Sequence, residues 1–195
     1  RLEISKSTGL RFGKHNLTDG FAVLYANDDD KVQTSSTLAF CGNGTDIQGT
    51  MKGRIPVVVL SGKTRGGVGG DLQAIQRYTA IADKLNKTDA KAGIVCLLDD
   101  QGSLANTLNY RGLLRDHGVM AYDKFARPVV RLPLMVLSTE ASHLLLAHMN
   151  ITIGPNGDLQ TDSVDKKAKA KLTLQVKAVK KAEASNVVAV LEGTS

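Results

Sequence analysis

Short apolar segments recur along the chain, and most are bounded by Gly, Pro, Asn or Asp. Their length and their β-branched side chains predict β-strands. Two of them, Ile55–Leu60 and Ile94–Leu98, are continuously apolar, as expected of central strands that are covered on both faces. The full set of expected strands is Phe21–Tyr25, Thr37–Cys41, Ile55–Leu60, Gly93–Leu98, Leu134–Leu137, Ala168–Ala178 and Val187–Leu191.

Two stretches carry sequence signals of helices. In Asp71–Lys87 the apolar side chains fall three and four positions apart, which is typical of an amphipathic helix. Ser138–Met149 begins with two possible N-cap residues, Ser138 and Thr139, and has Glu140 in its first turn. The sequence therefore predicts a helix in each stretch.

The first of these helices lies between the two central strands and defines the expected fold class. Strand 55–60, helix 71–87 and strand 94–98 form one βαβ unit, whose strands we expect to be parallel and whose connection we expect to be right-handed. The other strands are expected to flank it in antiparallel pairs. We therefore expect a compact, β-rich α/β fold, and 195 residues are enough to bury one hydrophobic core.

The positive charge of the chain is concentrated near its C-terminal end. The formal net charge is +6, and residues 163–185 hold seven Lys against Asp165 and Glu183. Within 168–178 apolar residues alternate with lysines and other polar residues, which predicts a half-buried strand with a lysine-rich outer face. Such lysines can protect an exposed strand from edge-to-edge association. A solvated face is the simpler interpretation, and a phosphate-binding stripe is the alternative.

Composition limits the classes of partner. The chain has four Phe, four Tyr and no Trp, and its lysine-rich segment contains no Arg or aromatic residue. We therefore expect no nucleic-acid partner, because stacking on bases needs exposed aromatic side chains. No apolar run approaches the length of a membrane span, so none is expected. Cys41 and Cys96 have no zinc-finger spacing; Cys96 is expected to be a buried thiol, with a Cys41–Cys96 bridge as the alternative.

Motifs for catalysis are incomplete. Gly62-Lys63-Thr64 follows a strand, but position 57 is Val where a phosphate-binding loop needs Gly. Asp99 and Asp100 end a central strand, where open α/β sheets bind ligands, and two carboxylates there could bind a cation. Turns after strands often carry Asp for structural reasons. We expect no catalytic residues and no resident cofactor in this chain.

Four segments resemble one family when they are taken in order. Met51–Gly62 (MKGRIPVVVLSG) resembles the "KGKIVVVLRG" strand of protease-associated domains. Ala80–Leu98 and Leu132–Leu144 resemble the helix-to-strand segment of that family and its "IPVVSISPEDGEALL" segment. Thr37–Gly44 stands where the family has "LVFVGYG", with Cys-Gly-Asn-Gly in place of the usual turn. A second departure is the Gly-rich stretch 63–71.

The end of the chain is similar to a segment of di-zinc aminopeptidases. Residues 184–195 resemble the strand that leads from the protease-associated domain into the catalytic domain, before the first His-x-Asp zinc motif. The resemblance implies an N-terminal lead-in at 1–20, a protease-associated domain at 21–183 and the start of a catalytic domain at 184–195. No zinc ligand carries over, so zinc is expected only in the catalytic domain of the parent protein.

The resemblance also implies a role. In this family the domain is non-catalytic, borders the active-site cleft of an exported peptidase, and helps to gate or select peptide substrates. The expected partners are therefore a peptide or protein substrate and the catalytic domain of the same protein. The expected location is secreted or periplasmic.

Residues 101–127 are the expected contact surface. Their leucines suggest a helix from Ser103, which Gly112 weakens, and aromatic and Arg side chains concentrate there as they do in contact hot spots. The candidate contact residues are Tyr110, Arg111, Arg115, Tyr122, Phe125 and Arg127. Packing of these residues over the sheet is the simpler interpretation. Two other functions stay open: a stand-alone protein-binding module of the same fold, and a small cation-binding domain that uses Asp99 and Asp100.

Overall fold

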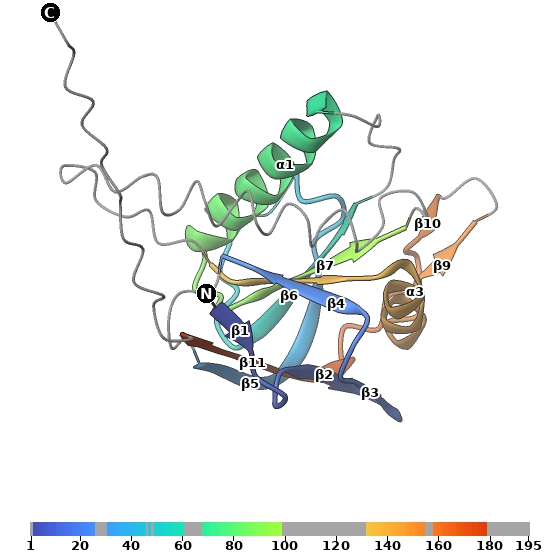
Figure 1. Ribbon diagram of the computed structural model, residues 1–195. Coiled ribbons are helices and arrows are strands. Elements are labelled where there is room, and N and C mark those ends of the chain that lie inside the picture. Colours follow the sequence, from blue (N-terminus) through green and yellow to red (C-terminus); the bar gives the residue numbers. More distant parts are fainter. Residues whose placement is uncertain are drawn as a thin grey trace, which may run out of the picture.

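The computed structural model describes residues 2–25, 31–45, 47, 49–60, 68–98, 132–154 and 158–178. Nine of the strands form one mixed sheet in the order β3-β2-β11-β5-β6-β7-β8-β4, with β1 paired to β11 as well (Figure 1). Their bounds are β1 Leu2–Ile4, β2 Gly9–Phe12, β3 His15–Leu17, β4 Phe21–Leu24, β5 Lys31–Phe40, β6 Arg54–Leu60, β7 Gly93–Leu97, β8 Leu134–Leu137 and β11 Lys169–Ala178. A separate pair joins β9 (Thr152–Ile153) to β10 (Leu159–Gln160).

The middle of the sheet is parallel. The strands β5, β6, β7 and β8 are neighbours that run in the same direction. The chain passes from β6 to β7 through helix α1 (Val68–Asn86), so the expected βαβ unit is confirmed. Antiparallel strands flank this centre, with β4 beside β8 and β11 beside β5. The expected β-rich α/β fold class is therefore confirmed.

Both predicted helices are present. Helix α1 begins at Val68, three residues before the expected start, and includes Gly69 and Gly70. Helix α3 (Thr139–His148) has Ser138 as its N-cap, because the Ser138 side chain accepts a hydrogen bond from the Ala141 N–H at 3.2 Å. The capping prediction is confirmed.

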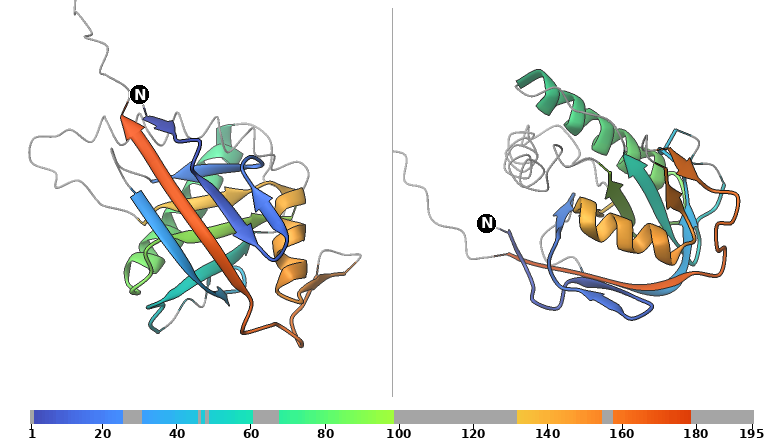
Figure 2. Two further views of the ribbon diagram at one scale, coloured as in Figure 1. Left: turned by 90° about the horizontal axis from the view of Figure 1, so that it is seen from below. Right: turned by 90° about the vertical axis from the view of Figure 1, so that its right-hand side faces the viewer.

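The sheet curls, and the two helices lie on opposite faces of its parallel part. Helix α3 lies inside the curl, with β2, β5 and β11 on one side of it and β7 on the other (Figure 2). Helix α1 lies outside, over the other face of β6 and β7. The outer cluster packs α1 residues Tyr78, Ile81, Ala82 and Leu85 against strand residues Val58, Val95, Leu134 and Val136. The strands β6, β7 and β8 are therefore buried on both faces, as their continuous apolar runs predict.

The strand β11 confirms the alternating pattern but not its suggested role at an edge. Ala170, Leu172, Leu174 and Val176 are buried in the inner core, whereas Lys169 and Lys171 are exposed. However, β11 pairs with β5 on one side and with β2 and β1 on the other. Its lysines do not protect a free edge, because β11 is an internal strand. The suggestion of edge protection is wrong.

The N-terminal residues contribute to the same sheet. Within the expected lead-in segment 1–20, the strands β1, β2 and β3 pair into the sheet beside β11. Between β1 and β2 the Thr8 hydroxyl donates to the Gln175 carbonyl oxygen at 2.9 Å and accepts from the Gln175 N–H at 3.0 Å. The Thr8 side chain thus makes the two hydrogen bonds with β11 that a backbone partner would make between β1 and β2. The boundaries at residues 20 and 183 stay predictions, and the expected strand Val187–Leu191 and helix from Ser103 lie outside the described residues.

Candidate functional site

The carboxyl ends of the parallel strands meet at one edge of the sheet, where ligands bind in open α/β folds. The described turn at this edge follows β5 and continues to pair with β6. The Cys41 N–H donates to the Val57 carbonyl oxygen at 2.8 Å, and the Val59 N–H donates to the Gly42 carbonyl oxygen at 2.7 Å. Gly42 and Gly44 have φ angles of +54° and +80°. Side chains at either position would strain the backbone, which explains the glycines of this Cys-Gly-Asn-Gly segment.

Helix α1 holds this turn against the sheet. A Cβ atom on Gly44 would lie 3.0 Å from Val58 Cγ1 and 3.3 Å from Ile81 Cγ1, so the glycine permits close packing. Lys84 Nζ donates to the carbonyl oxygens of Gly44, at 3.0 Å, and Thr45, at 2.8 Å. The Lys84 ammonium is thus bound to backbone oxygens, and its role at this edge is to position the turn.

Burial keeps both thiols protonated. Cys41 is half-buried, and desolvation raises its pKa against the smaller opposing effect of a backbone hydrogen bond with Val57. Cys96 is fully buried, and desolvation raises its pKa to about 12 against the smaller opposing effect of its hydrogen bond with Ser142. Both cysteines are free, so the alternative of a Cys41–Cys96 bridge is wrong. A protonated thiol is a poor nucleophile and a poor metal ligand, and the geometry favours neither role.

Ser142 links helix α3 to the same edge of the sheet. Its side chain is fully buried, and its Oγ accepts a hydrogen bond from the Leu97 N–H at 2.9 Å. The same hydroxyl donates to the Leu137 carbonyl oxygen at 3.5 Å. No buried side-chain nitrogen or oxygen within the described residues lacks a partner. This polar group therefore fixes the end of β7 and the end of β8 against α3.

The predicted site residues all lie outside the described residues. Leu98, whose N–H donates to the Leu60 carbonyl oxygen at 3.2 Å, is the last described residue before Asp99 and Asp100. The chain is described again from Leu132. The structure consequently brings none of the predicted contact residues to a known position: Tyr110, Arg111, Arg115, Tyr122, Phe125 and Arg127.

The histidines of α3 do not converge on one point. His143 is exposed, whereas His148 is half-buried with its ring 5.4 Å from the ring of Phe12 and its Nε2 3.1 Å from the Lys169 carbonyl oxygen. Within the described residues no three His, Cys, Asp or Glu side chains are grouped to hold a metal ion. In the same part of the chain, no helix combines the length and the apolar character that crossing a membrane requires.

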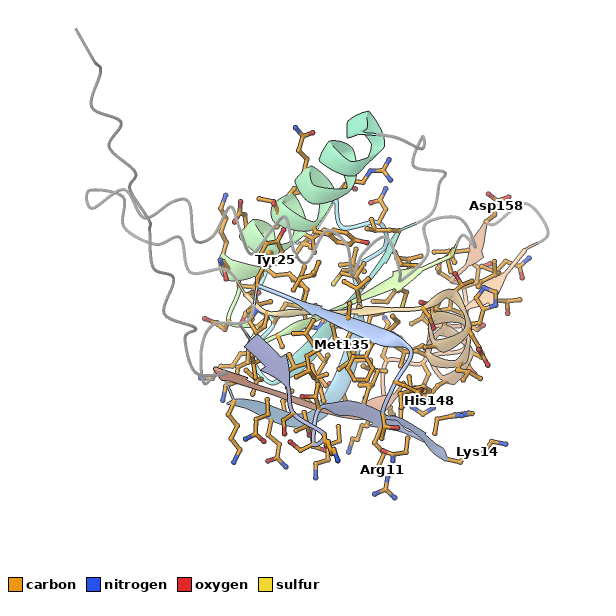
Figure 3. The ribbon with its side chains drawn as sticks, in the orientation of Figure 1. Arg11, Lys14, Tyr25, Met135, His148 and Asp158 are labelled. Carbon is orange, nitrogen blue, oxygen red and sulfur yellow. The ribbon has the colours of Figure 1, made fainter. Side chains whose placement is uncertain are left out.

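A polar hollow of about 290 Å³ lies on the outer face of β2, β3 and β11. Figure 3 shows Arg11, from β2, projecting there away from the body of the domain. The alternating pattern of 168–178 predicts only that Lys171 faces outward on β11, and no local pattern predicts the hairpin of β2 and β3 that completes the hollow. The lining residues are Lys6, Ser7, Thr8, Gly9, Arg11, Asn16, Thr18, Lys171 and Thr173.

The chain was compared with known proteins at three levels. No protein-family model matches it, and no curated protein matches its sequence. Among solved structures, it is weakly similar to the zinc aminopeptidase BSAP from Bacillus subtilis, with a TM-score of 0.46 and 14% sequence identity. The match covers 91% of this chain, which spans 30% of the length of that chain.

Proposed function

We propose that this chain is a non-catalytic protease-associated domain of a secreted zinc aminopeptidase. The domain would border the active-site cleft of the parent enzyme and help to gate or select peptide substrates. In this proposal zinc is bound by the catalytic domain. The residues of this chain contact the substrate and take no part in the chemical step.

One observation carries the proposal. The four segments that resemble the family follow one another along the chain, and their strands β5, β6, β7 and β8 are consecutive neighbours in the sheet in the same order. The helix-to-strand segment includes the end of α1, and the last segment includes the start of α3. The resembling segments therefore form one contiguous unit with the adjoining parts of both helices, as segments of a single domain should.

The contacts at the carboxyl edge fit an accessory role. Lys84 is bound to backbone oxygens, Ser142 is occupied by β7 and β8, and the two thiols are held protonated. Lys84 and Ser142 hold the edge from which residues 99–131 continue. A rigid edge that carries a long segment suits contact with a substrate.

The test uses the full-length protein that contains this chain. We expect hydrolysis of leucine p-nitroanilide that 1,10-phenanthroline abolishes and that added zinc restores. Replacing Arg111 and Tyr122 by Ala should lower kcat/KM for a peptide of several residues by about tenfold, as expected for two contact residues, while hydrolysis of the small anilide stays unchanged. The matched control is Arg77→Ala, an exposed Arg on α1.

The outcomes separate the parts of the proposal. Absence of zinc-dependent aminopeptidase activity in the full-length protein would contradict the proposed parent and favour a stand-alone binding module. Activity with unchanged peptide kinetics in the folded double variant would exclude residues 101–127 as the substrate contact. Calorimetry with calcium, magnesium and zinc tests the remaining alternative at Asp99 and Asp100, and heat at millimolar ion would favour it over the accessory role.

A further inference from the structure

The hollow on the outer face of β2, β3 and β11 brings three cations together. Lys6 precedes β2, Arg11 lies on β2 and Lys171 lies on β11, and all three line the same space. The remaining lining residues are glycine or polar, and none carries a carboxylate. Asp19, which follows the lining residue Thr18, does not line the hollow. The local charge is therefore positive without a balancing acid in its walls.

Two of these cations lie directly opposite each other across the strand pair. Arg11 on β2 is the register partner of Lys171 on β11. Like charges at directly opposed positions destabilise an antiparallel pair. The arrangement therefore costs free energy in the unbound protein, and an anion between the two side chains would remove that cost.

The charged side chains are free to bind, whereas the backbone beneath them is fixed. Within the described ranges, the side chains of Lys6, Arg11 and Lys171 have no hydrogen-bond or ion-pair partner. The turn that carries Lys6 is held by two bonds to Gln175: Ser7 Oγ donates to its Oε1 at 2.7 Å, and Thr8 Oγ1 donates to its carbonyl oxygen at 2.9 Å. The turn that carries Lys6 is therefore held in place, and the N–H donors of the three cationic side chains are available to a ligand.

The number of hydrogen-bond donors that line the hollow indicates which class of ligand it fits. Arg11, Lys6 and Lys171 supply charged N–H groups, and Asn16, Thr18 and Thr173 add an amide and two hydroxyls to the same walls. A carboxylate has two oxygens, whereas a tetrahedral dianion presents more oxygens and twice the charge. The lack of aromatic residues in the lining argues against a stacked base or sugar. We propose that this hollow binds a tetrahedral oxyanion of the phosphate type, held by Lys6, Arg11 and Lys171.

The proposal is tested on the 195-residue chain by titrating inorganic phosphate at low ionic strength and following backbone amide NMR signals. Sodium chloride at matched ionic strength is the reference, because salt screens exposed charges. We expect saturable shifts around Gly9–Arg11 and Lys171–Thr173. Arg11→Gln and Lys171→Gln should each weaken the affinity by about tenfold, which is the effect of losing one charge-assisted hydrogen bond.

The matched control is Lys169→Gln. Lys169 is exposed on the same face of β11, two residues from Lys171, but does not line the hollow. Its replacement changes the net charge equally but should weaken the phosphate affinity by less than about threefold, because Lys169 donates no hydrogen bond in the hollow and acts on the anion only through its charge. An equal loss of phosphate affinity in all three variants, or NMR shifts that never saturate, would mean that the face attracts anions only through its overall charge. Either result would overturn the proposal.

A parallel titration with a polyphosphate chain distinguishes the source of the anion. Equal affinity per phosphate group, with losses only in Arg11→Gln and Lys171→Gln, assigns the natural ligand to the free ion. Tighter binding of the chain, with the same losses plus a smaller one in Lys169→Gln, assigns it to phosphate groups on a polymer. Polyphosphate binding that Lys169→Gln and Lys171→Gln weaken equally, without saturable binding of free phosphate, contradicts a defined site.

Discussion

The parallel strands β5 to β8 and the antiparallel strands β3, β2 and β11 belong to one sheet but differ in how their outer face is covered. Helix α1 packs over the outer face of β6, β7 and β8 with a buried apolar cluster. Among the described elements no helix lies over the outer face of β2 and β11, which presents Arg11, Lys169 and Lys171 to solvent (Figures 1 and 2). The inner faces of both halves share one core around α3.

We call β5 to β8 with α1 the covered half of the domain, and β3, β2 and β11 the uncovered half. The two halves differ in what their sequences indicate. The covered half contains the segments that resemble a known family, and the apolar runs of β6, β7 and β8 are required by burial on both faces. The uncovered half contains an unpaired cluster of cations, for which burial supplies no reason. We infer that the covered half maintains the fold and that the uncovered half is free to carry a binding surface of its own.

The largest effect is expected in the cluster between α1 and the sheet. Leu85 is fully buried there, so Leu85→Ala should lower the free energy of unfolding by about 3 kcal/mol through lost burial and a remaining cavity. Urea denaturation measures the change, and Gln76→Ala, at an exposed position of α1, is the control that should change little. A loss below about 1 kcal/mol would mean that α1 adds little to the sheet and would break the comparison.

A smaller loss is expected at the polar link on the inner side. Ser142→Ala removes the acceptor of the buried Leu97 N–H and should cost about 2 kcal/mol, because an unsatisfied buried donor remains. Ser163→Ala, at an exposed position, should stay within about 0.5 kcal/mol of the original. If urea denaturation gives equal values for the two variants, the link between α3, β7 and β8 has no net effect on stability.

The third prediction concerns pH and the thiol of Cys96. Its pKa rises from 9.0 to about 12 on folding, so the unfolded chain loses this proton first and stability falls as pH rises through 9 towards 12. The stabilisation of the original protein over Cys96→Ala should therefore decrease by about 1.4 kcal/mol between pH 8 and pH 10. Urea denaturation of both proteins at the two pH values measures the difference. A constant difference would show that water reaches the thiol in the covered half.

The smallest effect is expected on the uncovered face. Lys169 is exposed and lies two residues from Lys171, so Lys169→Gln removes some repulsion and should change the free energy of unfolding by less than about 0.5 kcal/mol. Urea denaturation at low and high salt checks this value, and any stabilisation should shrink at high salt. A destabilisation above about 1 kcal/mol would mean that the Lys169 side chain makes a structural contact and that the face is covered.

The sequence predicted the covered half better than the uncovered half, for physical reasons. The βαβ unit and the capped helix α3 have local signals: continuous apolar runs, three- and four-residue spacing and Ser138. The strands β1, β2 and β3 are three or four residues long. The first two become strands by pairing with β11, more than a hundred and fifty positions away in the chain, and β3 then pairs with β2. Nothing within such short segments predicts that pairing.

The location of the candidate site was predictable from the sequence, but the contacts between its residues were not. The carboxyl edge was expected from the parallel strands, but the contact of Lys84 with Gly44 and Thr45 joins residues that are 40 and 39 positions apart. The hollow needs Lys6, Arg11 and Lys171 from both ends of the chain. Sequence patterns report local periodicity, and they carry no signal for a cluster that only the sheet order assembles.

The most direct measurement of the central claim is to determine the coding sequence beyond Ser195. If the covered half is the protease-associated domain of a zinc aminopeptidase, a His-x-Asp motif should follow within a few tens of residues, with further Asp, Glu-Glu and His ligands downstream. A stop codon directly after Ser195, or a continuation without these ligands, would contradict the proposed parent enzyme and leave a stand-alone binding module as the function of the chain.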